Sequence, residues 1–133
     1  MPTVTWTKTP RTIIASASIA ADGVARGTVD LRTPGGGPVT IKITNGATGP
    51  TDPCQARILI AHNSGATPTA AAAGADWKTV RTYTASITAL AVHEFSYDAP
   101  VGVMHLEVEL TGHTGQAVTG EAFMSEVTNA TGV

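Results

Sequence analysis

Apolar and polar residues alternate in short runs along this chain, and turn-forming residues separate the runs. The strictest alternation lies at residues 39–44, where apolar β-branched side chains and polar side chains follow one another. Successive side chains of a strand point to opposite faces, so this run predicts a strand with one face in the core and the other in solvent. The expected core residues are Val39, Ile41 and Ile43, and the expected outer residues are Thr40, Lys42 and Thr44.

Seven further segments have the composition of strands, at residues 12–20, 24–31, 54–62, 77–84, 91–97, 103–110 and 116–127. The segment at residues 54–62 has apolar side chains on both faces, which indicates a covered, central strand. Asp22-Gly23 predicts a hairpin turn between the first two strands. Helical periodicity is hard to find, and we expect the small-residue segment at residues 63–75 to be a loop.

Eight short strands with long irregular connections predict an all-β fold, namely an eight-stranded antiparallel β-sandwich that is jelly-roll-like. The length of 133 residues suits a single domain, which we place at residues 12–127. The Thr-rich residues 1–11 are expected to form an extended N-terminal arm, and residues 128–133 a flexible C-terminal tail. The sequence thus predicts one sandwich with two loose ends.

The chain has few charged groups, 14% of its residues, and a formal net charge of −2. In a typical soluble domain roughly a quarter of the residues are charged. A surface without an excess of basic residues does not neutralise phosphates, so nucleic acid is not expected as a partner. Apolar stretches are much shorter than a membrane span requires, and no export signal is visible, so we expect synthesis in the cytoplasm and no membrane. The single Cys54 is expected to be a small buried hydrophobe.

No motif predicts an enzyme: a nucleophile elbow, a phosphate-binding loop and paired-cysteine zinc spacing are all missing, and we expect no catalytic residues and no cofactor. His105, Glu107 and Glu109 share one face of a predicted strand. Alternate residues of a strand lie nearly 7 Å apart, so we expect no metal there but a solvated outer face or a subunit interface. His93 is expected to pack among aromatic neighbours, and His62 and His113 to sit at a strand end and a turn.

Aromatic residues are scarce, at 5% of the chain, yet by alternation Trp77 and Tyr83 share one face of the strand at residues 77–84 with the intervening Thr79 and Arg81, and three of these side chains form a candidate binding stripe. They are Trp77, Arg81 and Tyr83. Such a stripe is either a glycan-binding surface, because sugars stack on exposed aromatic rings, or the core side of the strand.

Several segments of the chain resemble small β-sandwich proteins from the structural gene clusters of tailed bacteriophages. They are VTIKITNGATGP at residues 39–50, the strands that follow it at residues 54–60 and around Trp77, and LTGHTGQAV at residues 110–118. The resemblance covers residues 12–127. This family includes capsid decoration, or cement, proteins. The resemblance implies a non-enzymatic structural virion protein that binds the outside of the capsid and stabilises it.

The partners that this resemblance implies are the major capsid protein and further copies of the chain, as a trimer or dimer. The candidate contact residues are Val4, Trp6, Lys8, Arg11, His105, Glu107 and Glu109. The alternative is a carbohydrate-binding β-sandwich module of a phage tail or fibre, which would use the stripe of Trp77, Arg81 and Tyr83.

Overall fold

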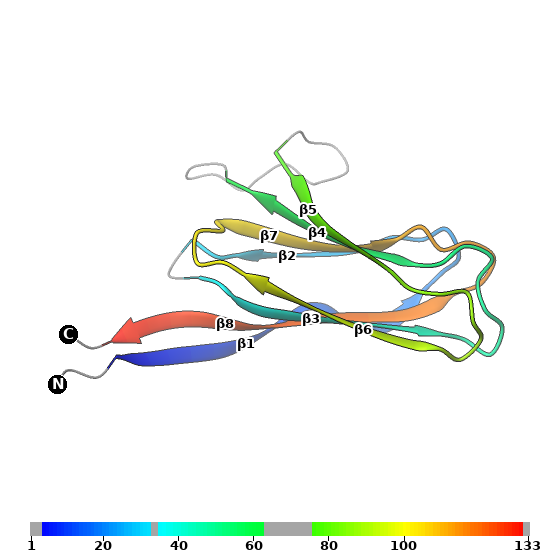
Figure 1. Cartoon of the computed structure of the whole chain (residues 1–133), viewed down its shortest axis with the longest axis horizontal. Helices are drawn as coiled ribbons and strands as arrows, with labels where there is room; N and C mark the ends of the chain where they lie inside the picture. The colour runs from blue at the N-terminus through cyan, green and yellow to red at the C-terminus, as the bar shows by residue number, and fades with distance from the viewer. Residues whose placement is uncertain (1–3, 33–34, 63–75, 132–133) are drawn as a thin grey trace.

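The computed structural model describes residues 4–32, 35–62 and 76–131, and the loop expected at residues 63–75 lies outside them. Its eight strands are β1 (Thr5–Ile19), β2 (Ala25–Asp30), β3 (Gly37–Asn45), β4 (Gln55–Ala61), β5 (Lys78–Thr84), β6 (Val92–Ala99), β7 (His105–Thr111) and β8 (Val118–Thr131). They form two four-stranded sheets that face each other (Figure 1). We call the sheet of β1, β8, β3 and β6 sheet A, and the sheet of β2, β7, β4 and β5 sheet B.

The strand order defines the topology. Sheet A has the order β1-β8-β3-β6 and sheet B the order β2-β7-β4-β5, and every strand pair is antiparallel. This interleaved order is that of a jelly roll. The predicted eight-stranded antiparallel sandwich with a jelly-roll arrangement is therefore confirmed.

The turn at Asp22-Gly23 does not close a hairpin. It carries the chain from β1 in sheet A to β2 in sheet B, with Asp22 in the left-handed region at a φ of 60°. In a jelly roll most consecutive strands lie in opposite sheets. The expectation of a hairpin was wrong because a turn motif alone does not tell which strands pair.

Apolar side chains on the inner faces of both sheets form the core. Val39, Ile41 and Ile43 of β3 are at most 1% exposed, so the alternation at residues 39–44 gave the right inner face. The central position expected for β4 is confirmed, because it pairs with β5 on one side and β7 on the other. Cys54 is fully buried in the same core, and burial raises the pKa of its thiol to about 11, as expected for a packing residue.

Of the expected N-terminal arm and C-terminal tail, residues 5–11 and 128–131 belong to strands of the sandwich. Residues 5–11 form the first half of β1 and pair with the last half of β8, from Thr5↔Thr131 to Arg11↔Met124. Thr-rich extended segments satisfy their backbone groups by pairing, which explains why residues 5–11 form a ladder with residues 124–131.

Simple alternation along residues 12–20 places Ile13, Ala15, Ala17 and Ile19 together on an inner face, and this is only partly right. Ile13 and Ile19 are buried, but Ala15 and Ala17 are exposed. The register of β1 with β8 shifts between Thr12 and Ile14 and again before Ala17. Each bulge adds a residue and reverses the alternation, which a simple period of two cannot anticipate.

Candidate functional site

A two-stranded ribbon, made of residues 5–8 of β1 and residues 127–131 of β8, extends beyond the rest of the sandwich (Figure 1). The ladder of β3 with β8 ends at Val39↔Met124, and loop residues Gly35 and Gly36 bond to Val127. Beyond Val127, β1 is the only strand that pairs with β8 in the described part of the chain. The ribbon therefore projects one exposed edge of sheet A away from the core.

The ribbon and the residue before it carry exposed apolar side chains. Trp6 is 57% exposed and Val4 53%, and Lys8 is also exposed. A large aromatic side chain with that much surface in water is a frequent anchor of protein interfaces. The structure thus leaves these three candidate contact residues available to a partner.

Arg11 has a structural role at the base of the ribbon. Its Nε donates a hydrogen bond to Glu126 Oε2 at 2.5 Å, and the Glu126 side chain is only 3% exposed whereas that of Arg11 is 48% exposed. A buried carboxylate needs such a partner. Arg11 therefore fixes β1 to β8 where the ribbon leaves the sandwich.

The charged face of β7 is buried, not solvated. His105, Glu107 and Glu109 are 5%, 2% and 1% exposed, so they are not part of the surface open to a capsid or a second copy. On β7, an inner strand of sheet B between β2 and β4, the side chains of both faces are buried from His105 to Leu110. The expectation of an exposed face was wrong because alternation shows two faces but not what covers each one.

Two arginines from the neighbouring strands hold Glu109. Arg26 of β2 and Arg57 of β4 are its direct cross-strand partners. Arg26 Nε donates to Glu109 Oε2 at 2.7 Å, and Arg57 donates through Nε to Oε1 at 2.9 Å and through its Nη2 as well. Burial alone would raise the pKa of Glu109, but these hydrogen bonds outweigh it and lower that pKa. Glu109 is thus an ionised carboxylate whose hydrogen bonds link β7 to both β2 and β4.

Glu107 lies one position further along the same face, between Thr28 of β2 and Leu59 of β4. Its Oε2 is buried and has no hydrogen-bond partner. Burial raises the pKa of this carboxyl, and the attraction of Arg26 and the repulsion of Glu109 are smaller effects. The charged form of Glu107 is therefore disfavoured in the folded chain.

We expect Glu107→Gln to raise the midpoint of thermal unfolding at neutral pH, because glutamine keeps the shape of the side chain and removes the buried charge. A carboxyl with a raised folded pKa costs stability above that pKa, and the cost disappears as the pH falls through it. The advantage of the variant over wild type should therefore shrink toward about pH 4. Calorimetry at both pH values measures it, and an unchanged or lowered midpoint at neutral pH contradicts the assignment.

The stripe of Trp77, Arg81 and Tyr83 does not exist as one surface. Trp77 is 8% exposed and packs with Leu59 and Ala61, whereas Tyr83 packs against the sandwich core. The pairing of β4 with β5 shifts between Ile58 and Leu59, so alternation from Trp77 to Tyr83 fails. These residues do not form a shared glycan-binding surface.

Tyr83 and Arg81 belong to an aromatic stack at the edge of the sandwich. The rings of Tyr83 and Phe95 stack with centroids 4.8 Å apart, and the Arg81 guanidinium lies 5.1 Å from the Tyr83 centroid. The Tyr83 hydroxyl donates to the carbonyl of Ser96 at 2.7 Å. This stack joins β5 of sheet B to β6 of sheet A.

The remaining histidines have structural surroundings or lie in the open. His93 packs near Phe95, with ring centroids 6.4 Å apart, and its Nε2 accepts a hydrogen bond from the Ser86 amide. His62 is exposed at the end of β4. His113, which was expected to sit at a turn without a special role, is fully buried, and its Nε2 donates to the carbonyl of Ala20 at 2.6 Å. This hydrogen bond connects the β7–β8 turn to the end of β1.

Within residues 4–32, 35–62 and 76–131, no group of three or more His, Cys, Asp or Glu side chains is placed to hold a metal ion. The same part of the chain contains no helix long and apolar enough to cross a membrane.

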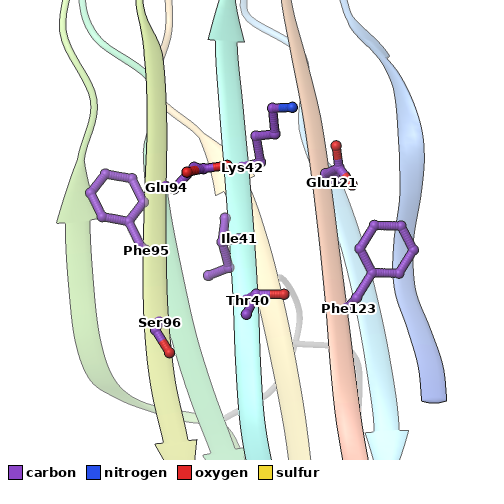
Figure 2. Close-up of a pocket in the computed structure, with 8 residues that line it drawn as sticks. All are labelled: Thr40, Ile41, Lys42, Glu94, Phe95, Ser96, Glu121 and Phe123. Atoms are coloured by element: carbon purple, nitrogen blue, oxygen red, sulfur yellow. The ribbon is translucent and has the colours of Figure 1, made fainter.

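One site that sequence reasoning missed is a hollow of about 570 Å³ on the outer face of sheet A (Figure 2). Its lining comes from β3, β6 and β8, and consists of Thr40, Ile41, Lys42, Glu94, Phe95, Ser96, Glu121 and Phe123. Alternation in residues 39–44 placed Thr40 and Lys42 outside, but only the pairing order shows that strands from distant parts of the sequence flank them.

A scan of the sequence against protein-family models found no match, and a search of curated proteins found none either. Comparison with solved structures found similar folds. The K3 cleaved adhesin domain of Lys-gingipain from Porphyromonas gingivalis W83 has a TM-score of 0.53 at 11% identity, with 86% of this chain and 74% of that chain covered.

Two other similar structures come from a bacterium and a virus. The Yersinia pseudotuberculosis-derived mitogen has a TM-score of 0.49 at 10% identity, with 91% of this chain and 87% of that chain covered. The enzymatically active domain of bacteriophage CBA120 tailspike protein 4 has a TM-score of 0.48 at 12% identity, with 94% and 19% covered. At such identities what the comparisons show is the β-sandwich fold alone.

Proposed function

We propose that the chain is a non-enzymatic structural protein of a virion, a capsid decoration protein that binds the outside of the shell and stabilises it. Its partners are the major capsid protein and, as a dimer or trimer, further copies of itself. The observation that carries the proposal is the β1/β8 ribbon, which projects from a closed sandwich and presents Trp6, with Val4 exposed just before it.

The physical features of the chain support this role. A decoration protein needs a stable body and an extended element that reaches over a neighbouring subunit. The ribbon is such an element, and β1 is an edge strand of sheet A. A free strand edge can add to a strand of another chain through backbone hydrogen bonds, while Trp6 supplies an apolar anchor.

The resemblance of residues 39–50 and 110–118 to small phage structural proteins supports the same proposal. A tail or fibre sugar-binding module was the alternative. It rested on Trp77 and Tyr83, which lie in separate clusters. A sugar-binding site made of these two residues together is therefore excluded.

The test is binding to emptied shells of the virus that encodes the chain, measured by co-sedimentation over a range of concentrations. The full chain should pellet with shells, and Trp6→Ala should weaken binding by about tenfold or more, as for an aromatic anchor. Val101→Ala is the matched control, because Val101 is 71% exposed outside the ribbon. Equal binding by wild type and Trp6→Ala, or no pelleting of the wild type, contradicts the proposal.

Deleting residues 1–8 should abolish shell binding and leave the sandwich folded. This deletion keeps Arg11, whose loss would strand the buried Glu126 carboxylate, and Thr9, whose hydroxyl bonds to that of Thr128. Light scattering after size exclusion should give a dimer or trimer for the full chain. If the wild type is a strict monomer, the homo-oligomer part of the proposal is wrong.

A further inference from the structure

The outer face of sheet A carries two rows of side chains that run across three strands. Lys42 of β3 pairs with Glu94 of β6 on one side and with Glu121 of β8 on the other. In the second row, Thr40 pairs with Ser96 and with Phe123. Directly opposite residues point to the same face of a sheet, so all six side chains lie on one face.

These rows form a compact patch. Three strands span about 10 Å and the two rows are about 7 Å apart along the strands. Figure 2 shows Glu94 and Ser96 on one side, Thr40 and Lys42 in the middle, and Glu121 and Phe123 on the other side. The hollow of about 570 Å³ above them lies within the range of small-molecule sites.

The charged groups of this patch are free to bind. No ion pair within 4.0 Å among the described residues includes Lys42, Glu94 or Glu121, whereas pairs such as Arg11–Glu126 and Arg57–Glu109 involve other side chains. Phe123 is 37% exposed, although most large apolar side chains of β8 point inward. The hollow therefore offers an ammonium donor, two carboxylate acceptors, two hydroxyls and an aromatic ring.

This chemistry selects among ligand classes. Two carboxylates against one ammonium repel anions, which argues against phosphates and acidic sugars. The ammonium between the carboxylates repels a divalent cation. An apolar peptide segment would desolvate all three charges without pairing them.

We propose that this hollow binds a short neutral glycan. Sugar hydroxyls donate to the carboxylates of Glu94 and Glu121 and accept from the ammonium of Lys42, which makes charge-assisted hydrogen bonds. The C–H face of a pyranose ring packs on Phe123. This activity is independent of the ribbon, and it uses none of the residues Trp77, Arg81 and Tyr83.

The experiment is an NMR titration of the full chain with lactose, maltose, cellobiose and chitobiose, and with sialyllactose as the anionic comparison. At least one neutral disaccharide should shift amide resonances of β3, β6 and β8 around the hollow. Sialyllactose should bind more weakly than lactose. If no neutral sugar shifts these resonances up to tens of millimolar, the proposal is overturned.

Variants test the assignment of residues. Phe123→Ala should raise the dissociation constant for the sugar by about tenfold, and Glu121→Gln should raise it as well. Val80→Ala is the control, because Val80 is 41% exposed on β5 of the other sheet. If Phe123→Ala and Glu121→Gln bind as wild type does while the fold is intact, the sugar sits elsewhere and the assignment is wrong.

The two proposals fail separately. Phe123→Ala should leave shell binding unchanged, and Trp6→Ala should leave sugar binding unchanged. A second copy of the chain is another possible occupant of the hollow. If Phe123→Ala lowers the oligomer mass and sugars do not bind, this face is a subunit contact and the glycan proposal is overturned.

Discussion

Replacing Gly27 by alanine is expected to destabilise the protein by at least about 3 kcal/mol, enough to leave much of it unfolded. Gly27 lies in β2, opposite Val108 of β7, and so points toward the inside of the sandwich. A Cβ atom at this position would lie 1.8 Å from the carbonyl oxygen of Ile13. That oxygen belongs to the backbone of β1 at its bulge, so no side-chain rotation relieves the overlap.

The physical reason is the close approach of two strands from different sheets. β1 of sheet A and β2 of sheet B contact each other at the edge of the sandwich, and only a residue without a side chain fits between them. Urea unfolding of the purified variant measures the loss of free energy of unfolding. If too little of the variant folds to be purified, a low yield of soluble protein reports the same loss.

Gly102→Ala is the matched control, because a Cβ atom there meets nothing within 4 Å. It should leave stability within about 0.5 kcal/mol of wild type or raise it slightly. If Gly27→Ala is as stable as Gly102→Ala, the packing of β1 on β2 described here is wrong.

Replacing Arg57 by methionine is expected to cost about 3 kcal/mol of folding free energy, since it leaves the 1%-exposed Glu109 with one partner, Arg26. Removing one member of a buried ion pair strands the charge of the other in a poorly solvated site. Methionine keeps most of the aliphatic length of arginine, so the loss is mainly electrostatic.

A double-mutant cycle separates charge from packing. Adding Glu109→Met to Arg57→Met should recover most of the lost stability, because an apolar side chain replaces the stranded carboxylate. Arg32→Met is the control: it breaks the surface pair with Asp30 and should change stability little. If the double variant is no more stable than Arg57→Met, Glu109 is not the reason for the loss.

The pH dependence follows from the lowered pKa of Glu109. Its ordinary value is 4.5, so the stability from this ion network is complete above that value and is lost as the pH falls through the lower folded pKa. The gap between wild type and Arg57→Met should therefore narrow in acid. Denaturant unfolding across pH measures it, and a gap that stays constant in acid contradicts this electrostatic origin.

Sequence reasoning succeeded where burial follows a simple period of two. Val39, Ile41 and Ile43 were assigned to the core because β3 is regular along its whole length. It failed at β1, where bulges around Ile14 reverse the faces, and at the register shift between Ile58 and Leu59, which separates Trp77 from Tyr83. Register shifts arise between two paired strands, so the alternation of apolar and polar residues within one strand does not predict them.

The candidate sites were harder to predict for a second reason. The burial of the outer face of β7 depends on Arg26 and Arg57, which come from strands distant in sequence. The hollow on sheet A likewise requires β3, β6 and β8 to be neighbours. Strand order comes from the whole topology, and one sequence does not encode it locally.

The most direct test of the central claim is an electron cryo-microscopy reconstruction of emptied shells of the encoding virus after incubation with the full chain. We predict jelly-roll density at regular positions on the outer surface, with the ribbon of β1 and β8 seated on the major capsid protein and Trp6 buried in the contact. Shells without added density, or density attached through a face that leaves Trp6 in solvent, would contradict the account.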